Sequence, residues 1–151
     1  MIIREVEMAR EQIESVVRRL MEAHNVGNPA LLEGLFAPGY VNHTGPGGQQ
    51  NAQARRQQIA MLRAAAPDLR TQIDDLLVAG DTAVVRWTTR ATITGQRLET
   101  AFGPVEPRGQ KTEISGVNIV RTSGDQIAEE WYYWEEAKWL QQLGVARQTP
   151  G

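Results

Sequence analysis

The residues best suited to chemistry lie in one run near the C-terminal end, IAEEWYYWEEAKW, at residues 127–139. If the run begins as a strand, alternation places Glu130, Tyr132 and Trp134 on one face and Glu129 on the other. A carboxylate among aromatic rings is desolvated, which raises its pKa and suits it to exchange protons near neutral pH. The alternative is a structural carboxylate that pairs with an Arg of the neighbouring strand. The residue types leave both roles open.

The strand before this run supplies candidate partners. Turn formers at residues 123–125 predict a hairpin that places residues 117–120 opposite residues 128–131, with Arg121 nearby. On a further strand, VVRWTTRATITG, alternation puts Arg90 on the face opposite Trp87. An inward Arg90 would bind an anion or a carboxylate, whereas an outward one would only solvate the surface.

A second polar group precedes a glycine-rich segment. Tyr40, Asn42 and His43 come just before TGPGGQQ at residues 44–50, which we expect to be a mobile loop. Polar groups beside a loop are well placed to bind a ligand or to orient a water molecule. An exposed or capping role is the alternative for His43. The loop lacks the spacing of a phosphate-binding motif, so its glycines indicate flexibility only.

Composition excludes several other kinds of chemistry. The 151 residues include no Cys and two His, which excludes thiol nucleophiles, Cys-ligated metals and a three-His zinc centre. Sixteen basic and eighteen acidic residues give a net charge of −2, so we expect neither a nucleic-acid nor a membrane partner. Charges at Arg4, Glu5 and Glu7 are untypical of a signal peptide, and we expect a cytoplasmic protein without metal or cofactor.

Helices are predicted mainly in the first half of the chain. Apolar residues recur at helical spacing over 8–23, and Asn28-Pro29 is typical of the start of a short helix that buries residues up to Phe36. Asn51 can cap a helix that continues to Ala66. A last helix is predicted over 136–143.

Strands are predicted mainly in the second half. Residues rich in β-branched and aromatic side chains, separated by turn formers, occur over 73–78, 84–94, 112–121 and 126–134. We also predict a short strand at 98–101, an extended segment at 40–43 and a loop over the rest of 96–110. Helices followed by antiparallel strands predict one α+β domain over residues 1–151, in which about three N-terminal helices pack on the sheet. A sheet curved around the first helix would enclose an apolar pocket.

Four segments, in this order, resemble the SnoaL-like polyketide cyclase family: LLEGLFAPGYVNH, VVRWTTRATITG, EPRGQKTEISGVNIVR and GDQIAEEWYYWEEAKWLQQLG. The resemblance covers residues 8–145. It places the chain in the nuclear-transport-factor-like superfamily, beside ketosteroid isomerase and limonene-epoxide hydrolase. It implies a conical α+β barrel with a strongly curved antiparallel sheet, a homodimer, and cofactor-free acid/base chemistry on a polyketide or other small carbonyl compound.

The resemblance also implies roles for individual residues. Family members often end in Glu-His-Trp-Asp, whose Asp works with a His on the preceding strand. Here Tyr132 stands at the Asp position, and Glu130 and Asn118 stand at the His positions. The implied mechanism uses Glu130 as general acid/base, with Tyr132 and Asn118 donating to the substrate oxygen. The substrate-binding residues implied are Tyr40, Asn42, His43, Arg90 and Trp134.

Two alternatives remain. Tyr40-Val41-Asn42 matches the Tyr-x-Asn that holds the attacking water in limonene-epoxide hydrolase, and Arg90 matches its Arg. The two Asp of that enzyme fall on Thr92 and Tyr132. Epoxide hydrolysis is therefore one alternative, and a non-catalytic small-molecule-binding protein is the other.

Overall fold

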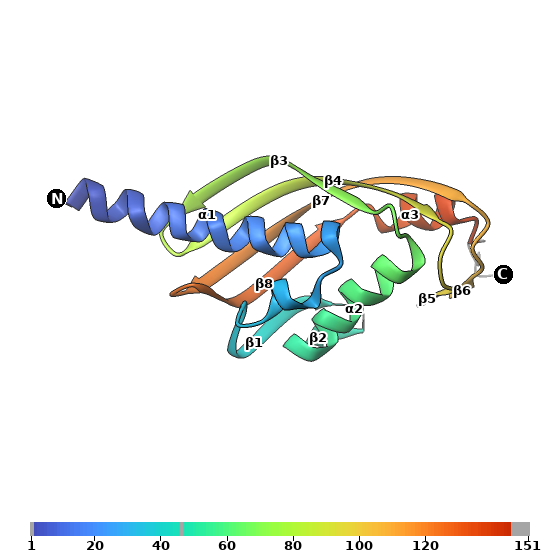
Figure 1. Ribbon diagram of the computed structural model, residues 1–151, viewed down its shortest axis with the longest axis horizontal. Helices are drawn as coiled ribbons and strands as arrows, with labels where there is room; N and C mark the ends of the chain where they lie inside the picture. Colours follow the sequence, from blue (N-terminus) through green and yellow to red (C-terminus); the bar gives the residue numbers. More distant parts are fainter. Residues whose placement is uncertain (1, 46, 146–151) are drawn as a thin grey trace.

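A long N-terminal helix lies across one face of a sheet in the computed structural model, which describes residues 2–45 and 47–145 (Figure 1). Helix α1 spans Ile2–Val26 and buries the apolar stripe that predicted it, including Ile13, Val17 and Leu20. Its bounds extend beyond the predicted 8–23 at both ends. Because this stripe packs on the sheet, the inner face of the sheet is the one beneath α1.

The described residues form a sheet of six strands in the order β2-β1-β8-β7-β4-β3. Strands β1 and β8 pair in parallel, and the other neighbouring strands of the described residues pair antiparallel. The predicted α+β class, with helices on a mostly antiparallel sheet, is therefore confirmed. The strands are β1 (Phe36–Gly45), β2 (Gly48–Gln50), β3 (Arg70–Ala79), β4 (Thr82–Ile93), β7 (Gln110–Ser123) and β8 (Gln126–Trp134).

The segment between α1 and β1 differs from the prediction. The expected short helix is one 3₁₀ turn, η1 (Pro29–Leu32), capped by the side chain of Asn28. Strand β1 already begins at Phe36 and continues through Pro38-Gly39, because Gly39 adopts a left-handed φ of 79° and the register with β8 shifts there. The described residues thus form three α-helices packed on the sheet, with α1 and α2 N-terminal, α3 C-terminal, and the 3₁₀ turn η1 in place of the short helix.

Helices α2 and α3 match their predicted positions. Helix α2 spans Ala52–Ala65, and the side chain of Asn51 accepts a hydrogen bond from the amide of Ala54, as a cap should. Helix α3 spans Glu136–Leu143 and ends at Gly144, whose φ is 80°. In Figure 1, α3 lies at the end of the molecule opposite the N-terminus of α1.

A small hairpin departs from the expected loops. Strand β5 (Leu98–Thr100) was predicted, whereas β6 (Gly103–Val105) falls in a segment predicted as loop. The glycine-rich segment likewise contributes β2 rather than loop alone. Gly95 brings the hairpin close to α2: a Cβ there would lie 2.0 Å from the carbonyl oxygen of Ala64. The hairpin is thereby held beside the C-terminal end of α2.

Within the part of the chain that the structure describes, two apolar clusters support the fold. The larger lies between α1, η1 and the sheet, and the smaller joins the end of α2 to β4, β5, β6 and α3. Among the described residues, no helix is long and apolar enough to span a membrane.

Candidate functional site

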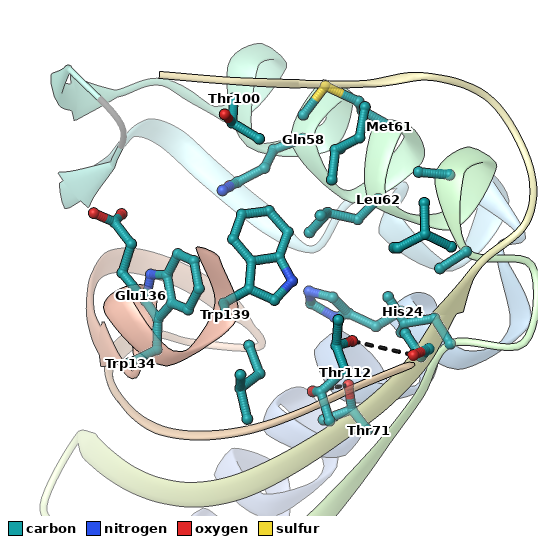
Figure 2. Close-up of a pocket in the computed structure, with 18 of the residues that line it drawn as sticks. His24, Gln58, Met61, Leu62, Thr71, Thr100, Thr112, Trp134, Glu136 and Trp139 are labelled. Carbon is teal, nitrogen blue, oxygen red and sulfur yellow. Dashed lines mark hydrogen bonds between the residues drawn. The ribbon is translucent and has the colours of Figure 1, made fainter. Parts of the chain in front are cut away.

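A cavity of about 250 Å³ is lined by residues of both apolar clusters. Its walls come from the second half of α1, from α2, from the inner face of the sheet, from the β5–β6 hairpin and from α3 (Figure 2). Most of the lining is apolar, and the volume lies just below the ~300–1,000 Å³ typical of drug-sized ligands. The polar side chains on its wall include His24, Arg55, Gln58, Asn118 and Tyr132.

The inner face of β8 carries the even-numbered residues, which matches the predicted alternation. Glu130 and Tyr132 are buried, whereas Tyr133 is exposed. The hairpin register is shifted by two residues from the prediction, so that Asn118 lies opposite Tyr132. Ser123 pairs with Gln126 across a two-residue turn, which gives one residue of the shift, and the bulge between Arg121 and Thr122 gives the other. Asn118 and Tyr132 thus stand side by side on the cavity wall.

Glu130 is fully buried and accepts four hydrogen bonds. Its Oε1 accepts from the Tyr40 hydroxyl at 2.5 Å and from Arg55 Nε at 3.1 Å. Its Oε2 accepts from Asn118 Nδ2 at 2.5 Å and from Arg55 Nη2 at 3.2 Å. The ion-pair partner therefore comes from α2, not from a neighbouring strand as the structural alternative had it.

This environment keeps Glu130 ionised. Burial raises the pKa of the carboxyl, but the charge of Arg55 and the hydrogen bonds from Arg55 and Tyr40 outweigh burial and lower the pKa below its usual value. The expectation of a raised pKa was wrong, because a cation shares the buried site. Among the described residues, Arg55 and Asn118 reach the cavity wall, and Glu130 does not.

Asn118 is held from two sides. Its Oδ1 accepts a hydrogen bond from Trp87 Nε1 at 2.7 Å, so the amide nitrogen is turned toward Glu130. Trp87 lies against Gly116, where a Cβ would come within 2.4 Å of the indole ring. The glycine thus makes room for the ring that orients Asn118.

His24 is a functional candidate that the sequence interpretation missed. It continues the buried stripe of Ile13, Val17 and Leu20 and points into the cavity from α1 (Figure 2). Its Nδ1 lies 2.9 Å from the carbonyl oxygen of Leu20, and because a carbonyl only accepts, Nδ1 carries the proton. In the neutral ring Nε2 then has a free lone pair, and it has no hydrogen-bond partner among the described residues.

The surroundings of His24 keep it neutral. Burial, followed by the positive charge of Arg55, lowers its pKa from 6.5 to about 4, against the raising effects of the Leu20 carbonyl and Glu130. The imidazole is therefore uncharged at neutral pH, and its Nε2 is a hydrogen-bond acceptor.

We expect an NMR titration of His24 with a midpoint near pH 4, and a pH-dependent stability that follows from it. The unfolded chain binds this proton below about pH 6.5 and the folded chain only near pH 4, so stability falls as the pH decreases from 6.5 to 4. Chemical denaturation across this range should show a shallower decrease for His24→Gln. A midpoint near 6.5, or equal slopes in both proteins, would contradict the proposed environment.

Arg55 and Gln58, both on α2, were also missed. Arg55 is buried on the same helix face as Ile59, and the Glu130 carboxylate raises its pKa further although burial opposes the charge. Spacing was the available signal: Arg55, Ile59 and Leu62 follow one another at intervals of four and three residues, which puts the arginine on the apolar stripe.

The predicted substrate-binding residues do not all come together. Trp134 lines the cavity and packs edge-on against Trp139, with ring centroids 5.2 Å apart. Tyr40 and Asn42 are buried, but Tyr40 donates to Glu130, and Asn42 donates to Gln50. Neither Tyr40 nor Asn42 is among the described residues that line the cavity.

His43 and Arg90 lie on the outer face, which corrects their predicted placement. His43 stacks on Trp131 with centroids 4.7 Å apart, and its Nε2 lies 3.2 Å from Glu129. Arg90 is exposed and pairs with Glu113. Both positions follow from strand alternation, because their neighbours Asn42 and Ala91 take the buried places.

Known structures share this architecture. IdmH of Streptomyces antibioticus, described as a candidate polyketide cyclase, is 25% identical with a TM-score of 0.73, over 89% of this chain and 99% of that chain. TsrD of Streptomyces laurentii is 23% identical with a TM-score of 0.77, and the match covers 91% of this chain and 98% of TsrD. AclR of Streptomyces galilaeus, described as a candidate hydroxylase, is 18% identical with a TM-score of 0.77. The match covers 93% of this chain and 85% of AclR.

No curated protein matches the sequence. The SnoaL-like polyketide cyclase family matches residues 14–143, which include the elements from the second half of α1 to the end of α3. The chain belongs to the SnoaL-like polyketide cyclase family.

Proposed function

We propose that the chain is a cofactor-free enzyme that moves a proton on a small enolisable carbonyl compound, as in aldol cyclisation or isomerisation. One observation carries this proposal: the apolar cavity presents a neutral histidine nitrogen, His24 Nε2, with no partner among the described residues. Membership of a polyketide cyclase family supports the same class of chemistry. A cavity of about 250 Å³ favours a compound with a single ring or with two fused rings.

The proposed step pairs one base with hydrogen-bond donors. His24 Nε2 takes a proton from the carbon beside the carbonyl, and the C–H electron pair moves to form an enolate. Tyr132 donates its hydroxyl hydrogen to the enolate oxygen, and Asn118 supplies the amide hydrogen that Glu130 leaves free. The enolate carbon then attacks a second carbonyl carbon, and the alkoxide that forms takes the proton from His24. In an isomerisation the proton returns instead to another carbon, and in both cases His24 is neutral again.

A low pKa does not disqualify His24 as the base. A group with a pKa of about 4 is almost wholly unprotonated at neutral pH. Ketosteroid isomerase, a member of the same superfamily, uses an aspartate base whose pKa is also low, about 4.6. The donors at the enolate oxygen must then supply much of the stabilisation.

Glu130 takes a positioning role in this proposal instead of the acid/base role that the sequence implied. Its carboxylate is ionised, fully buried and surrounded by donors, and it orders Arg55, Tyr40 and Asn118. The epoxide hydrolase alternative has less support, because Tyr40 and Asn42 have buried protein partners away from the cavity wall.

The proposal predicts that the protein accelerates exchange of the α-protons of 2-tetralone, a bicyclic ketone, for deuterium in D₂O near neutral pH. The measurement is loss of the α-proton signals by NMR, with affinity measured separately from tryptophan fluorescence. The matched control is Ala91→Phe, which fills the cavity from its wall and should reduce exchange to the buffer rate. Tight binding with exchange at the buffer rate would favour a non-catalytic binding protein and contradict the enzyme.

A further inference from the structure

Four polar groups on the cavity side of α2 and β8 form a single chain of hydrogen bonds. Arg55 holds Glu130 through Nε and Nη2, and its Nη1 lies 3.3 Å from Gln58 Oε1. At the other end of the same amide, Gln58 Nε2 lies 2.8 Å from the Tyr132 hydroxyl. Figure 2 shows Gln58 directed into the cavity from α2.

Each bond in this chain can run in only one direction. A guanidinium group has donors and no acceptor, so the end of Gln58 that faces Arg55 must be its carbonyl oxygen. The amide nitrogen must then face Tyr132, and an amide N–H only donates. Tyr132 therefore accepts in this contact, and its own hydrogen must point elsewhere. Among the described residues, no acceptor takes that hydrogen, and Tyr132 lines the cavity.

We propose that Gln58 is a positioning residue that fixes Tyr132 as a hydrogen-bond donor to an oxygen acceptor of the ligand. The fixed charge of the Arg55 and Glu130 pair sets the direction of the Gln58 amide, and the amide sets the direction of the Tyr132 hydroxyl. The ligand class is a carbonyl compound or its enolate, in preference to a hydrocarbon of the same shape. This inference deepens the proposed function and rests on it.

The relay also explains why a glutamine, and not a glutamate, suits position 58. A carboxylate there would accept from Arg55 and from Tyr132 alike, because it has no hydrogen to donate when ionised. The Tyr132 hydrogen would turn from the cavity toward that carboxylate. Gln58→Glu is thus nearly isosteric, but it changes Tyr132 from an acceptor to a donor in its contact with residue 58. The neighbouring Gln57 is exposed, so Gln57→Glu is a charge-matched control.

The test compares 2-tetralone with tetralin, which has the same rings and no oxygen. The parent protein and Gln57→Glu should bind 2-tetralone with its carbonyl stretching band shifted to lower frequency and in preference to tetralin. Gln58→Glu should show a smaller shift, because only Asn118 then donates to the ligand oxygen. It should also lose about tenfold of that preference, the effect of one hydrogen bond. Tyr132→Phe, which removes the donor outright, should give the same loss while tetralin affinity stays unchanged.

An equal carbonyl shift in the parent and in Gln58→Glu would overturn the relay, as would an unshifted carbonyl in the parent. The readouts are a vibrational frequency and an affinity ratio, so they do not depend on turnover. Failure of the proposed proton transfer would appear separately, as exchange at the buffer rate in a protein that still shifts the carbonyl band.

Discussion

Glu130→Gln is expected to lower the free energy of unfolding by about 3–5 kcal/mol. The substitution preserves shape, so it leaves no cavity, but it removes the negative charge that Arg55 needs in a site where both side chains are almost completely buried. The new amide hydrogens would also meet donors, because the Tyr40 hydroxyl, Asn118 Nδ2 and two Arg55 nitrogens all point at the carboxylate. The measurement is chemical denaturation at pH 7.

Glu129→Gln is the matched control, because it makes the same chemical change at the adjacent residue. Glu129 faces outward and contacts His43 and Arg121 where water competes for the charges. Such pairs contribute little, so this variant should lose at most about 1 kcal/mol. Equal losses in the two variants would contradict the assignment of Glu130 as the buried anion that orders the site.

Periodic features of the sequence predicted much of the fold. The apolar stripe of α1, the cap at Asn51, the four main strands and the final helix all follow from local patterns that tertiary structure does not override. The errors arose where one backbone conformation decides the outcome. Gly39 carries β1 through a Pro-Gly pair that otherwise signals a stop, and a bulge beyond Arg121 shifts the β7 and β8 register.

The site was harder to predict, because its key contacts join residues far apart in the chain. Alternation correctly grouped Glu130 with Tyr132, but no local pattern pairs Glu130 with Arg55, which lies 75 residues earlier. That missing cation reversed the expected pKa shift of Glu130. His24 was overlooked although it lies on the apolar face of α1, where a polar residue is either a satisfied core group or a functional one.

His24→Gln is expected to reduce α-proton exchange on a bound ketone by about 10²–10⁴-fold, the usual contribution of a positioned general base. Gln keeps a polar side chain of similar length but has no basic nitrogen, so it cannot take the carbon-bound proton. Because the substitution removes an interaction of the transition state, the rate at saturating ketone should fall while the affinity changes little. Affinity and saturated rate are therefore to be measured on the same samples.

The most direct test of His24 as the base compares the two histidines of the chain, His24 on the cavity wall and His43 on the outer face. The measurement is the rate of deuterium incorporation into saturating 2-tetralone at neutral pH for the parent protein, His24→Gln and His43→Gln. We expect a loss of at least about 100-fold for His24→Gln and a rate within about twofold of the parent for His43→Gln. An unchanged rate in His24→Gln, or a comparable loss in both variants, would contradict the role of His24 as the base.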